Sequence, residues 1–373
     1  MAVDTRAASP RRRRFLLEER PAPSVALSAA IAVASVVAAL FFGAVLLLVT
    51  GEDPLAAYEA LIDESLGSPV AVGLTLVQTT PLILTGLAAA VAYRMRLWTI
   101  GAEGQLIAGA IVAAGVALKL GETSSVVVIS LSFLGGMVGG ILWALIPALA
   151  RAYARTDEVI STLMLNFIAL SLVDYLIVDT VSLWRDHTNL SQPSGALLPE
   201  SVLLPSLFED ANVGILLAVL CAVAMAVFLR KTVWGRDLAV AGDSPKAARY
   251  AGIDARRTIV GVMLLSGALA GLAGAVQVTN VTFALDKAAL SPGLGIGYAG
   301  IVVAALARLD PLAVVPVAFL VAALLNAGPG LDLVGVAPAV VVVLQGLILL
   351  MVVGGQFFLS YRIRRPLAGD EGR

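Results

Sequence analysis

A series of long apolar segments constrains this chain most, because a helix needs about 20 consecutive apolar residues to cross the hydrocarbon core of a bilayer. Ten apolar segments follow one another, at residues 25–49, 70–92, 101–120, 126–150, 158–179, 212–229, 258–280, 297–307, 311–327 and 337–357. Charged residues make up only 14% of the chain, against roughly 25% in soluble domains. The sequence therefore predicts an all-α, polytopic membrane protein with about ten transmembrane helices.

The eighth segment departs from this pattern, because residues 297–307 are fewer than the roughly 20 that a span requires. With its neighbour it reads "GIGYAGIVVAALARLDPLAVVPVAFLVAALLNAG". Discontinuous helices of this kind occur in transporters, where protein or water satisfies irregular backbone at membrane depth. We therefore expect the eighth and ninth segments to form either two half-helices or one broken pair.

The distribution of basic residues orients the segments. With the N-terminus inside and ten crossings, the outer loops hold Lys119, Arg185 and Lys287, and the other 22 of the 25 Lys and Arg residues lie inside. This bias is the positive-inside pattern of membrane proteins. We therefore expect both termini in the cytoplasm, with 1–20 as a basic tail, 21–361 as one transmembrane domain and 362–373 as a second tail.

Two connecting loops are longer than the rest. The loop at 180–211 is expected outside, where it covers the outer mouth or meets an external partner, and the loop at 230–257 is expected inside.

The chain lacks the residues that most enzymatic sites need. Its single cysteine, Cys221, can form neither an intrachain disulfide nor a cysteine metal site. Its single histidine, His187, lies among polar residues and is expected in a solvated loop, with a ligand or proton-relay role as the alternative. The sequence also contains no GxxxxGK[ST] pattern for ATP phosphates. We expect no catalysis, no metal and no cofactor within this chain, and no nucleic acid partner.

The inner loop, "RKTVWGRDLAVAGDSPKAARYAGIDARR", carries the signals of a short helix. Asp243 or Ser244 suits the N-cap, Pro245 the first helical position and Gly252 a left-handed stop. The expected surface comprises Asp243, Ser244, Pro245, Lys246, Ala247, Ala248, Arg249, Tyr250 and Gly252. Its alanines permit close approach, while its cations and tyrosine offer charge and an aromatic anchor. This helix is predicted either to dock a cytosolic partner or to rest on lipid headgroups.

Part of that loop, "GRDLAVAGDSPKAARYAGI", resembles the coupling-helix segment of ABC importer permeases. Three stretches, "IGAEGQLIAGA" at 100–110, "DEVISTLMLNFIA" at 157–169 and "GIGYAGIVVAALARLDPLAVV" at 295–315, agree with this resemblance in their order along the chain. They resemble segments of permeases that serve nucleoside and simple-sugar importers, the branch paired with basic-membrane-lipoprotein binding proteins. The resemblance covers roughly residues 70–355.

The resemblance implies a ten-span importer fold of the ribose and vitamin B12 permease type, in a bacterial cytoplasmic membrane. In that family two permease chains lie side by side, commonly as two different homologues in nucleoside importers. Two cytosolic ATPase subunits bind the ATP and contact the coupling helices, and an extracytoplasmic binding lipoprotein delivers the solute. This chain would then provide the path for a nucleoside or simple sugar.

Three other interpretations remain open at this point. Branched-chain amino acid permeases share the wider architecture. An ion-coupled secondary transporter would need ionisable groups within the membrane, and the candidates Glu103, Glu158, Asp174 and Asp179 all lie near segment ends or a loop. A scaffold without transport would leave the capped inner helix and the polar residues within spans unexplained.

Neutral polar residues within the apolar segments mark the candidate path, because a solute with hydroxyls and amides needs uncharged hydrogen-bond partners. The expected path residues are Gln78, Thr79, Thr80, Asn166, Gln277 and Asn280. The first three precede Pro81, which can bend its helix, and Asn166 lies four residues after Thr162, on the same helix face. The alternative for each is a hydrogen bond between helices, a common role of such side chains in membranes.

Glu103 and Gln105 stand at the start of the third apolar segment, and Tyr298 follows a run of glycines at the eighth. A carboxylate at the positive end of a helix dipole can accept backbone N–H bonds, or pair with Arg94 or Arg96. We predict that Glu103 is either a structural cap or a gating or coupling contact, and that Gln105 and Tyr298 share a structural or gating role.

Overall fold

The computed structural model describes residues 16–19, 25–121, 123–188, 194–208, 210–286, 290, 295–328 and 361–364, with scattered residues between 331 and 355. The chain divides into two compact units, Leu47–Gly346 and the combination of Met1–Leu46 with Leu347–Arg373. Helix α1 (Val25–Thr50) coincides with the first predicted segment and crosses the boundary between them.

The smaller unit contains a strand pair that the sequence did not predict. Strand β1 (Leu16–Glu19) pairs antiparallel with β4 (Tyr361–Arg364), so that Leu16 lies opposite Arg364. Two stretches expected within or beside separate tails therefore form one ladder.

Six helices of the larger unit are long and apolar enough to cross a membrane, within the described part of the chain. They are α3 (Pro69–Arg94), α4 (Ala102–Leu120), α5 (Ser125–Leu149), α6 (Glu158–Asp174), α7 (Gly214–Lys231) and α10 (Ala255–Val276). Three of them continue into π-helical turns, η1 (Ala150–Ala154), η2 (Tyr175–Asp179) and η4 (Gln277–Thr282). These helices confirm six of the predicted segments.

The eighth and ninth segments form two separate short helices. Helix α12 (Ile296–Leu306) has 11 residues and α13 (Pro311–Asn326) has 16. At 1.5 Å per residue, α12 is about 16 Å long, which is roughly half the thickness of a bilayer core. The tenth predicted segment, 337–357, lies largely outside the described residues, so the expected total of about ten spans stays a prediction.

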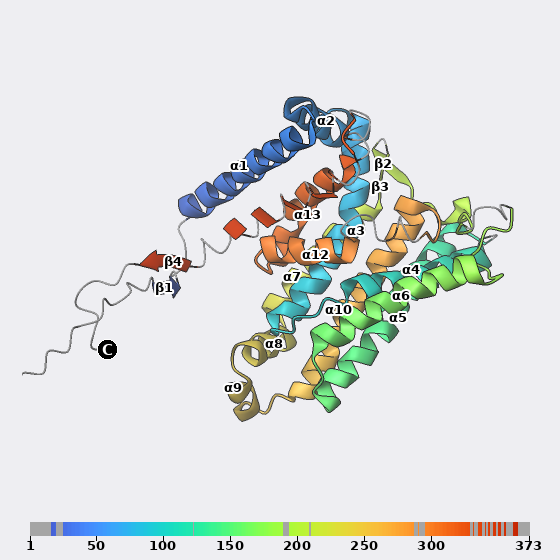
Figure 1. Ribbon diagram of the computed structural model, residues 1–373. Helices are drawn as coiled ribbons and strands as arrows, with labels where there is room; N and C mark the ends of the chain where they lie inside the picture. The colour runs from blue at the N-terminus through green and yellow to red at the C-terminus, as the bar shows by residue number, and fades with distance from the viewer. Residues whose placement is uncertain are drawn as a thin grey trace, which may run out of the picture. The chain divides into compact units, whose positions relative to one another are not determined.

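The short inner helix that the caps predicted is present as α9 (Pro245–Tyr250). The unforeseen elements are α2 (Pro54–Leu66), α8 (Val233–Asp243), the 3-10 turn η3 (Glu200–Val202) and the paired strands β2 (Ser206–Phe208) and β3 (Ala211–Asn212). Figure 1 shows α8 and α9 at one end of the larger unit, and α2 with β2 and β3 at the other.

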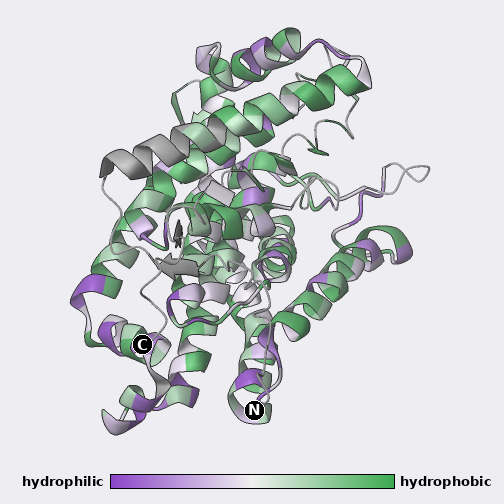
Figure 2. Ribbon diagram, turned by 60° about the vertical axis from the view of Figure 1, so that its left-hand side comes forward, coloured by the Kyte–Doolittle hydropathy of each residue, from purple (hydrophilic) through white to green (hydrophobic). Residues whose placement is uncertain are grey.

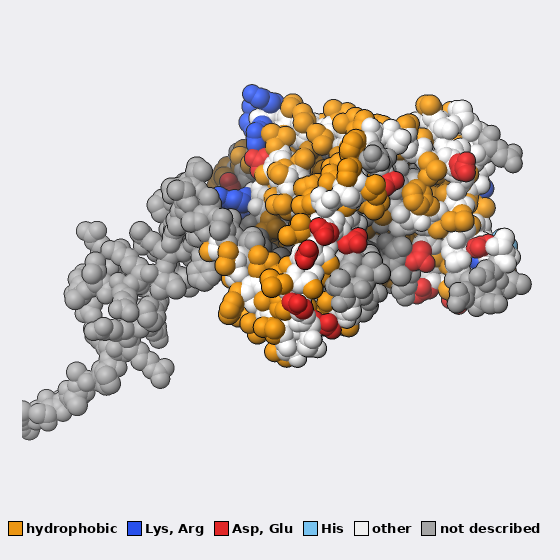
Figure 3. All heavy atoms as spheres, turned by 90° about the horizontal axis from the view of Figure 1, so that it is seen from above, with side chains coloured by type: hydrophobic (Ala, Val, Ile, Leu, Met, Phe, Trp, Pro, Cys, Tyr) orange, Lys and Arg blue, Asp and Glu red, His pale blue; other side chains and the backbone are white. Residues whose placement is uncertain are grey.

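Side-chain polarity follows this division into two ends. Figure 2 shows hydrophobic residues along most of each long helix and hydrophilic residues mainly near helix ends and in loops. In Figure 3, Asp and Glu side chains gather on the end that carries α2, where Glu59, Asp63 and Glu64 are exposed.

Polar caps set the starts of several helices. The Asp157 side chain accepts hydrogen bonds from the backbone N–H groups of Val159 and Ile160 at the start of α6. Ser68, Asp254 and Asp310 cap α3, α10 and α13 in the same way. Each cap satisfies backbone donors that have no partner within the helix.

Glycines hold α4, α5 and α10 close together. A Cβ atom at Gly271 would meet the carbonyl oxygen of Gly136 and lie 2.9 Å from the Cα atom of Gly140. A Cβ atom at Gly274 would meet the carbonyl oxygen of Leu106. Small residues therefore bring these backbones into contact, as the glycine spacing predicted.

Candidate functional site

The predicted inner loops come together at one end of the larger unit. Arg96, after α3, lies 3.7 Å from the Asp243 carboxylate at the end of α8. Arg230, near the end of α7, lies 2.7 Å from the Asp310 carboxylate before α13. Two of the basic residues that suggested the orientation, Arg96 and Arg230, therefore share one end of the larger unit, and the charge bias predicts that this end faces the cytoplasm.

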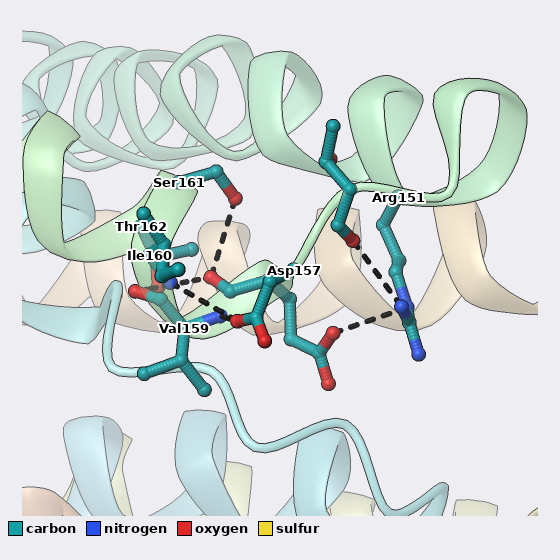
Figure 4. Close-up of polar contacts among 8 residues, drawn as sticks. Arg151, Asp157, Val159, Ile160, Ser161 and Thr162 are labelled. Atoms are coloured by element: carbon teal, nitrogen blue, oxygen red, sulfur yellow. Dashed lines mark hydrogen bonds and ion pairs between the residues drawn. The ribbon is translucent and has the colours of Figure 1, made fainter.

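The connection from α5 to α6 contributes to the same end. Figure 4 shows the Asp157 carboxylate directed at the backbone of Val159 and Ile160, with the Arg151 side chain beside the turn. Arg151 Nε lies 3.1 Å from the carboxylate of Glu158, whose residue is buried. This ion pair closes a turn in which Arg155 adopts a left-handed φ of 56°, and sequence reasoning missed it.

Helix α9 has the caps that the sequence predicted. Ser244 is its N-cap, since its Oγ atom accepts a hydrogen bond of 3.3 Å from the N–H of Ala247. Gly252 adopts a left-handed φ of 76°, and the N–H of Ile253 donates to the Ala248 carbonyl over 2.9 Å. This bond pattern is a glycine stop, so the chain leaves the helix where expected.

The exposed face of α9 carries its charged and aromatic side chains. Lys246, Ala247, Arg249 and Tyr250 are exposed, with Tyr250 at 93%, while Ala248 is buried at 1%. Asp243 belongs to the last turn of α8 and pairs with Arg96 rather than capping α9. The side chain of Pro245 lies outside the described structure.

Helix α8 connects α9 to the corner between α3 and α4. A Cβ atom at Gly242 would meet the carbonyl oxygen of Arg94 and lie 3.1 Å from the Cα atom of Met95. Leu238 and Ala241, three residues apart, are both buried. This spacing, together with the Thr232 cap, is the sequence signal that would have revealed α8.

A buried polar cluster surrounds the start of α4. Glu103 is 0% exposed, and its Oε2 atom accepts a hydrogen bond of 2.7 Å from the N–H of Gly297 in α12. Asn166 Oδ1, on α6, accepts a bond of 2.9 Å from the N–H of Gly104. Asn166 Nδ2 donates to the Ile100 carbonyl over 2.9 Å and to the Tyr298 hydroxyl over 3.0 Å. The cluster therefore joins α4, α6 and α12.

Glu103 accepts a backbone N–H bond, one of the two arrangements expected, but the bond is to a different helix from its own. The expected arginine partners are engaged elsewhere: Arg94 donates to the Leu309 carbonyl over 3.4 Å, and Arg96 pairs with Asp243. Gln105, two residues later, is 1% exposed, and its Oε1 atom has no hydrogen-bond partner among the described residues.

The predicted path residues on α3 make hydrogen bonds within their own helix. Thr79 Oγ1 donates to the Thr75 carbonyl over 2.6 Å, and Thr80 Oγ1 donates to the Leu76 carbonyl over 3.2 Å. Gln78 is half-buried. Thr79 also lines an otherwise apolar groove of about 390 Å³ between α3, α7 and α13. Bonds of this kind satisfy a hydroxyl inside lipid without a second helix.

The other predicted path residues fall into two places. Gln277 and Asn280 are buried in the π-helical turn η4, which contacts α3 and α4. Asn280 Nδ2 donates to Thr279 Oγ1 over 3.1 Å, and Thr279, which the sequence analysis did not select, is 0% exposed. Asn166 belongs instead to the cluster at the start of α4. Their role as path residues stays a prediction.

The loop at 180–211 folds back onto the opposite end of the unit. Trp184 Nε1 donates to the Ile111 carbonyl of α4 over 2.9 Å, and the N–H of Leu198 donates to the Phe283 carbonyl over 2.9 Å. Within the loop, hydrogen bonds from the Thr188 backbone and hydroxyl lower the pKa of Asp186 below its usual value. The loop is therefore tied down across α4 and the end of η4.

The comparisons with known proteins agree with these features. Residues 71–353 match a family described as "Branched-chain amino acid transport system / permease component". The Nucleoside ABC transporter permease protein NupB of Lactococcus lactis subsp. cremoris (strain MG1363) is 33% identical over 85% of this chain and 88% of its own length. The Glucose ABC transporter permease protein TsgB13 of Haloferax volcanii is 34% identical over 89% of this chain and 88% of its own.

A third relative extends the agreement to a named nucleoside. The Guanosine ABC transporter permease protein NupP of Bacillus subtilis (strain 168) is 34% identical over 73% of this chain and 77% of its own length. The family match covers most of the chain, including the cluster at α4 and the whole of α8 and α9. With its membrane-spanning helices, this chain belongs to the family of transport-system permease components described above.

Proposed function

We propose that this chain is the permease subunit of an ATP-driven importer and provides the path for a nucleoside or simple sugar. The relatives whose names mention nucleosides, guanosine and glucose support this class of solute. Two cytosolic ATPase subunits, a second permease and an external binding lipoprotein would complete the transporter. Selectivity would then lie first in the binding protein, and the path would mainly set the rate.

The observation that carries the proposal is the capped helix α9 at the basic end. Six residues are too few to form a stable helix alone, so the Ser244 cap, the Gly252 stop and packing through Ala248 must hold it. Its cations and Tyr250 are nevertheless left exposed. An aromatic side chain that is 93% exposed on a braced helix is typical of a docking surface.

In this mechanism α9 acts as the contact with the ATPase subunits. ATP binding would draw the two ATPases together and displace α9 with α8, which packs on the corner between α3 and α4. The transmembrane helices would then open the path to the other side. The polar residues of α3 and η4 are the proposed lining, since η4 contacts α3.

Reversing the charge of α9 tests the docking surface. We expect Lys246→Glu combined with Arg249→Glu to leave the protein inserted but to separate ATP hydrolysis from uptake in vesicles containing the complete transporter. The matched control is Lys231→Glu combined with Arg155→Glu, which makes the same charge change at exposed positions outside α8 and α9. Uptake at the wild-type level in the α9 variant would contradict docking. Equal losses of uptake in both variants would show a general effect of charge rather than a docking surface.

The family description favours a second candidate solute, a branched-chain amino acid. Binding of guanosine, glucose and leucine to the binding protein that partners this chain distinguishes the candidates directly. We expect guanosine or glucose to bind and leucine not to bind, and the reverse pattern would replace the proposed solute class. Uptake that resists vanadate but is abolished by ionophores would favour an ion-coupled transporter instead.

A further inference from the structure

The segment between α3 and α4, residues 95–101, lies between the α8 end and the buried polar cluster. On one side, Gly242 of α8 packs against Arg94 and Met95 with no room for a side chain. On the other side, Ile100 is held through both backbone groups. Its N–H donates to Thr162 Oγ1 over 3.2 Å, and its carbonyl accepts from Asn166 Nδ2 over 2.9 Å. Displacement of α8 therefore acts on a segment that is fixed to α6.

The same segment leads directly into the first turn of α4, where Glu103 contacts α12. Gly297 has no side chain, and a Cβ atom there would meet the backbone N of Glu103. Because Gly297 has no side chain, the backbones of α4 and α12 can touch, and Glu103 Oε2 lies 2.7 Å from the backbone N of Gly297. The Tyr298 hydroxyl, one residue further, accepts the bond from Asn166.

Among the described residues, no side chain next to α12 in the sequence caps its start, so the contact with Glu103 is important for this helix. Its N-cap is Gly295, with a left-handed φ of 83° and no side chain to accept the first N–H groups. The first turn is buried, with Ile296 at 0% exposed. Donors at a buried helix start need a partner. Glu103, from a different helix, supplies one for the N–H of Gly297.

We infer that Glu103 is a positioning residue for transport: its carboxylate holds the first turn of α12 against α4, so that movement of α8 and α9 reaches the buried half-helix. This inference rests on the proposed function. Contacts alone do not establish coupling between two sites, so the decisive measurement is the number of solute molecules imported per ATP hydrolysed.

Three substitutions at Glu103 separate the hydrogen bond from the charge. Glu103→Gln keeps an acceptor oxygen at the same reach, Glu103→Asp keeps the charge but withdraws it by one methylene, and Glu103→Ala removes both. We expect the import ratio of the Gln variant to stay within about twofold of wild type, and that of the Ala variant to fall about tenfold, the effect of losing a hydrogen bond to a charged group. The Asp variant should fall between them.

Glu158→Ala is the matched control for Glu103→Ala, because Glu158 is also a buried carboxylate at a helix start and its ion pair with Arg151 does not involve α12. Its import ratio should equal that of wild type. An unchanged ratio in Glu103→Ala, or equal losses in the Gln and Ala variants, would overturn the inference. If the Glu103→Ala variant does not insert into the membrane, the other two variants decide. An import ratio for Glu103→Asp that equals or exceeds the ratio for Glu103→Gln would also overturn the inference.

The two proposals fail in different ways in these vesicles. If the chain is not an ATP-driven permease, the wild-type complex itself imports no solute on addition of ATP. If only the role of Glu103 is wrong, the wild type imports solute, the α9 variant remains uncoupled, and the Glu103 variants show the wrong order.

Discussion

Replacing Gly140 by alanine tests whether α5 and α10 pack backbone against backbone. The added Cβ would meet the carbonyl oxygen of Gly267 and lie 2.7 Å from the Cα atom of Gly271. Both are main-chain atoms, which cannot rotate away as a side chain can, so the two helices must separate. Inside lipid that separation loses the close packing that chiefly holds helices together.

The expected loss of stability follows from two opposing effects. Overpacking a well-packed interior costs about 1–3 kcal/mol. Alanine in place of glycine within a helix returns about 1 kcal/mol. Because backbone atoms oppose the new methyl group, we take the upper end of the cost and expect a net loss of about 2 kcal/mol in the free energy of unfolding.

Gly135 provides the matched control on the same helix. A Cβ atom at Gly135 would lie 3.2 Å from Cγ2 of Val116 and 3.3 Å from Cγ1 of Val112, which are side-chain atoms able to shift. Gly135→Ala should therefore lose no stability and keep up to about 1 kcal/mol of the gain from replacing a helical glycine. Tryptophan fluorescence during SDS-induced unfolding of the purified chain in micelles measures both variants. Equal midpoints for Gly140→Ala and wild type, or equal losses in the two variants, would refute backbone packing.

Two further predictions concern the polar contacts. Asn166→Ala should lower uptake more than Gln78→Ala, because Asn166 joins three helices through bonds that a methyl group cannot replace. Wild-type uptake in both variants, with docking of the binding protein intact, would show that both residues serve packing only. A double-mutant cycle on Arg230→Ala and Asp310→Ala, measured by SDS unfolding, should give a coupling energy of about 0.2–1 kcal/mol, because both side chains are partly exposed. A coupling energy of several kcal/mol would show instead that the pair is shielded from water.

The helices could be predicted from the sequence where their signals are local. Apolar runs of membrane length located α3 to α7 and α10, because lipid leaves an unpaired backbone no alternative to a helix. Ser244 and Gly252 located α9, because caps and stops act within a few residues. Helix α2 was missed because its four acidic and polar positions interrupt the apolar run, although its Asp53 cap and Pro54 are ordinary start signals.

The site residues were predictable as polar positions but their partners were not. Thr162 and Asn166 could be placed on one helix face from their spacing, and in the structure both bond to Ile100 in the segment before α4. Nothing in the spacing identifies Ile100 or Tyr298 as the groups opposite. Such pairings join residues 62 to 132 positions apart, so only the packing of the helices decides them.

The short length of α12 and the burial of Glu103 are explained together. A helix of 11 residues that begins inside the protein leaves N–H groups in a place that water does not reach, and Gly295 cannot cap them. A buried carboxylate is costly unless it is paired or hydrogen-bonded. Glu103 lies in the first turn of α4 and bonds to the first turn of α12, so the positive ends of two helix dipoles stabilise one negative charge. Each feature lowers the energetic penalty of the other, so removing the acceptor oxygen of Glu103, as in Glu103→Ala, should disturb both helices.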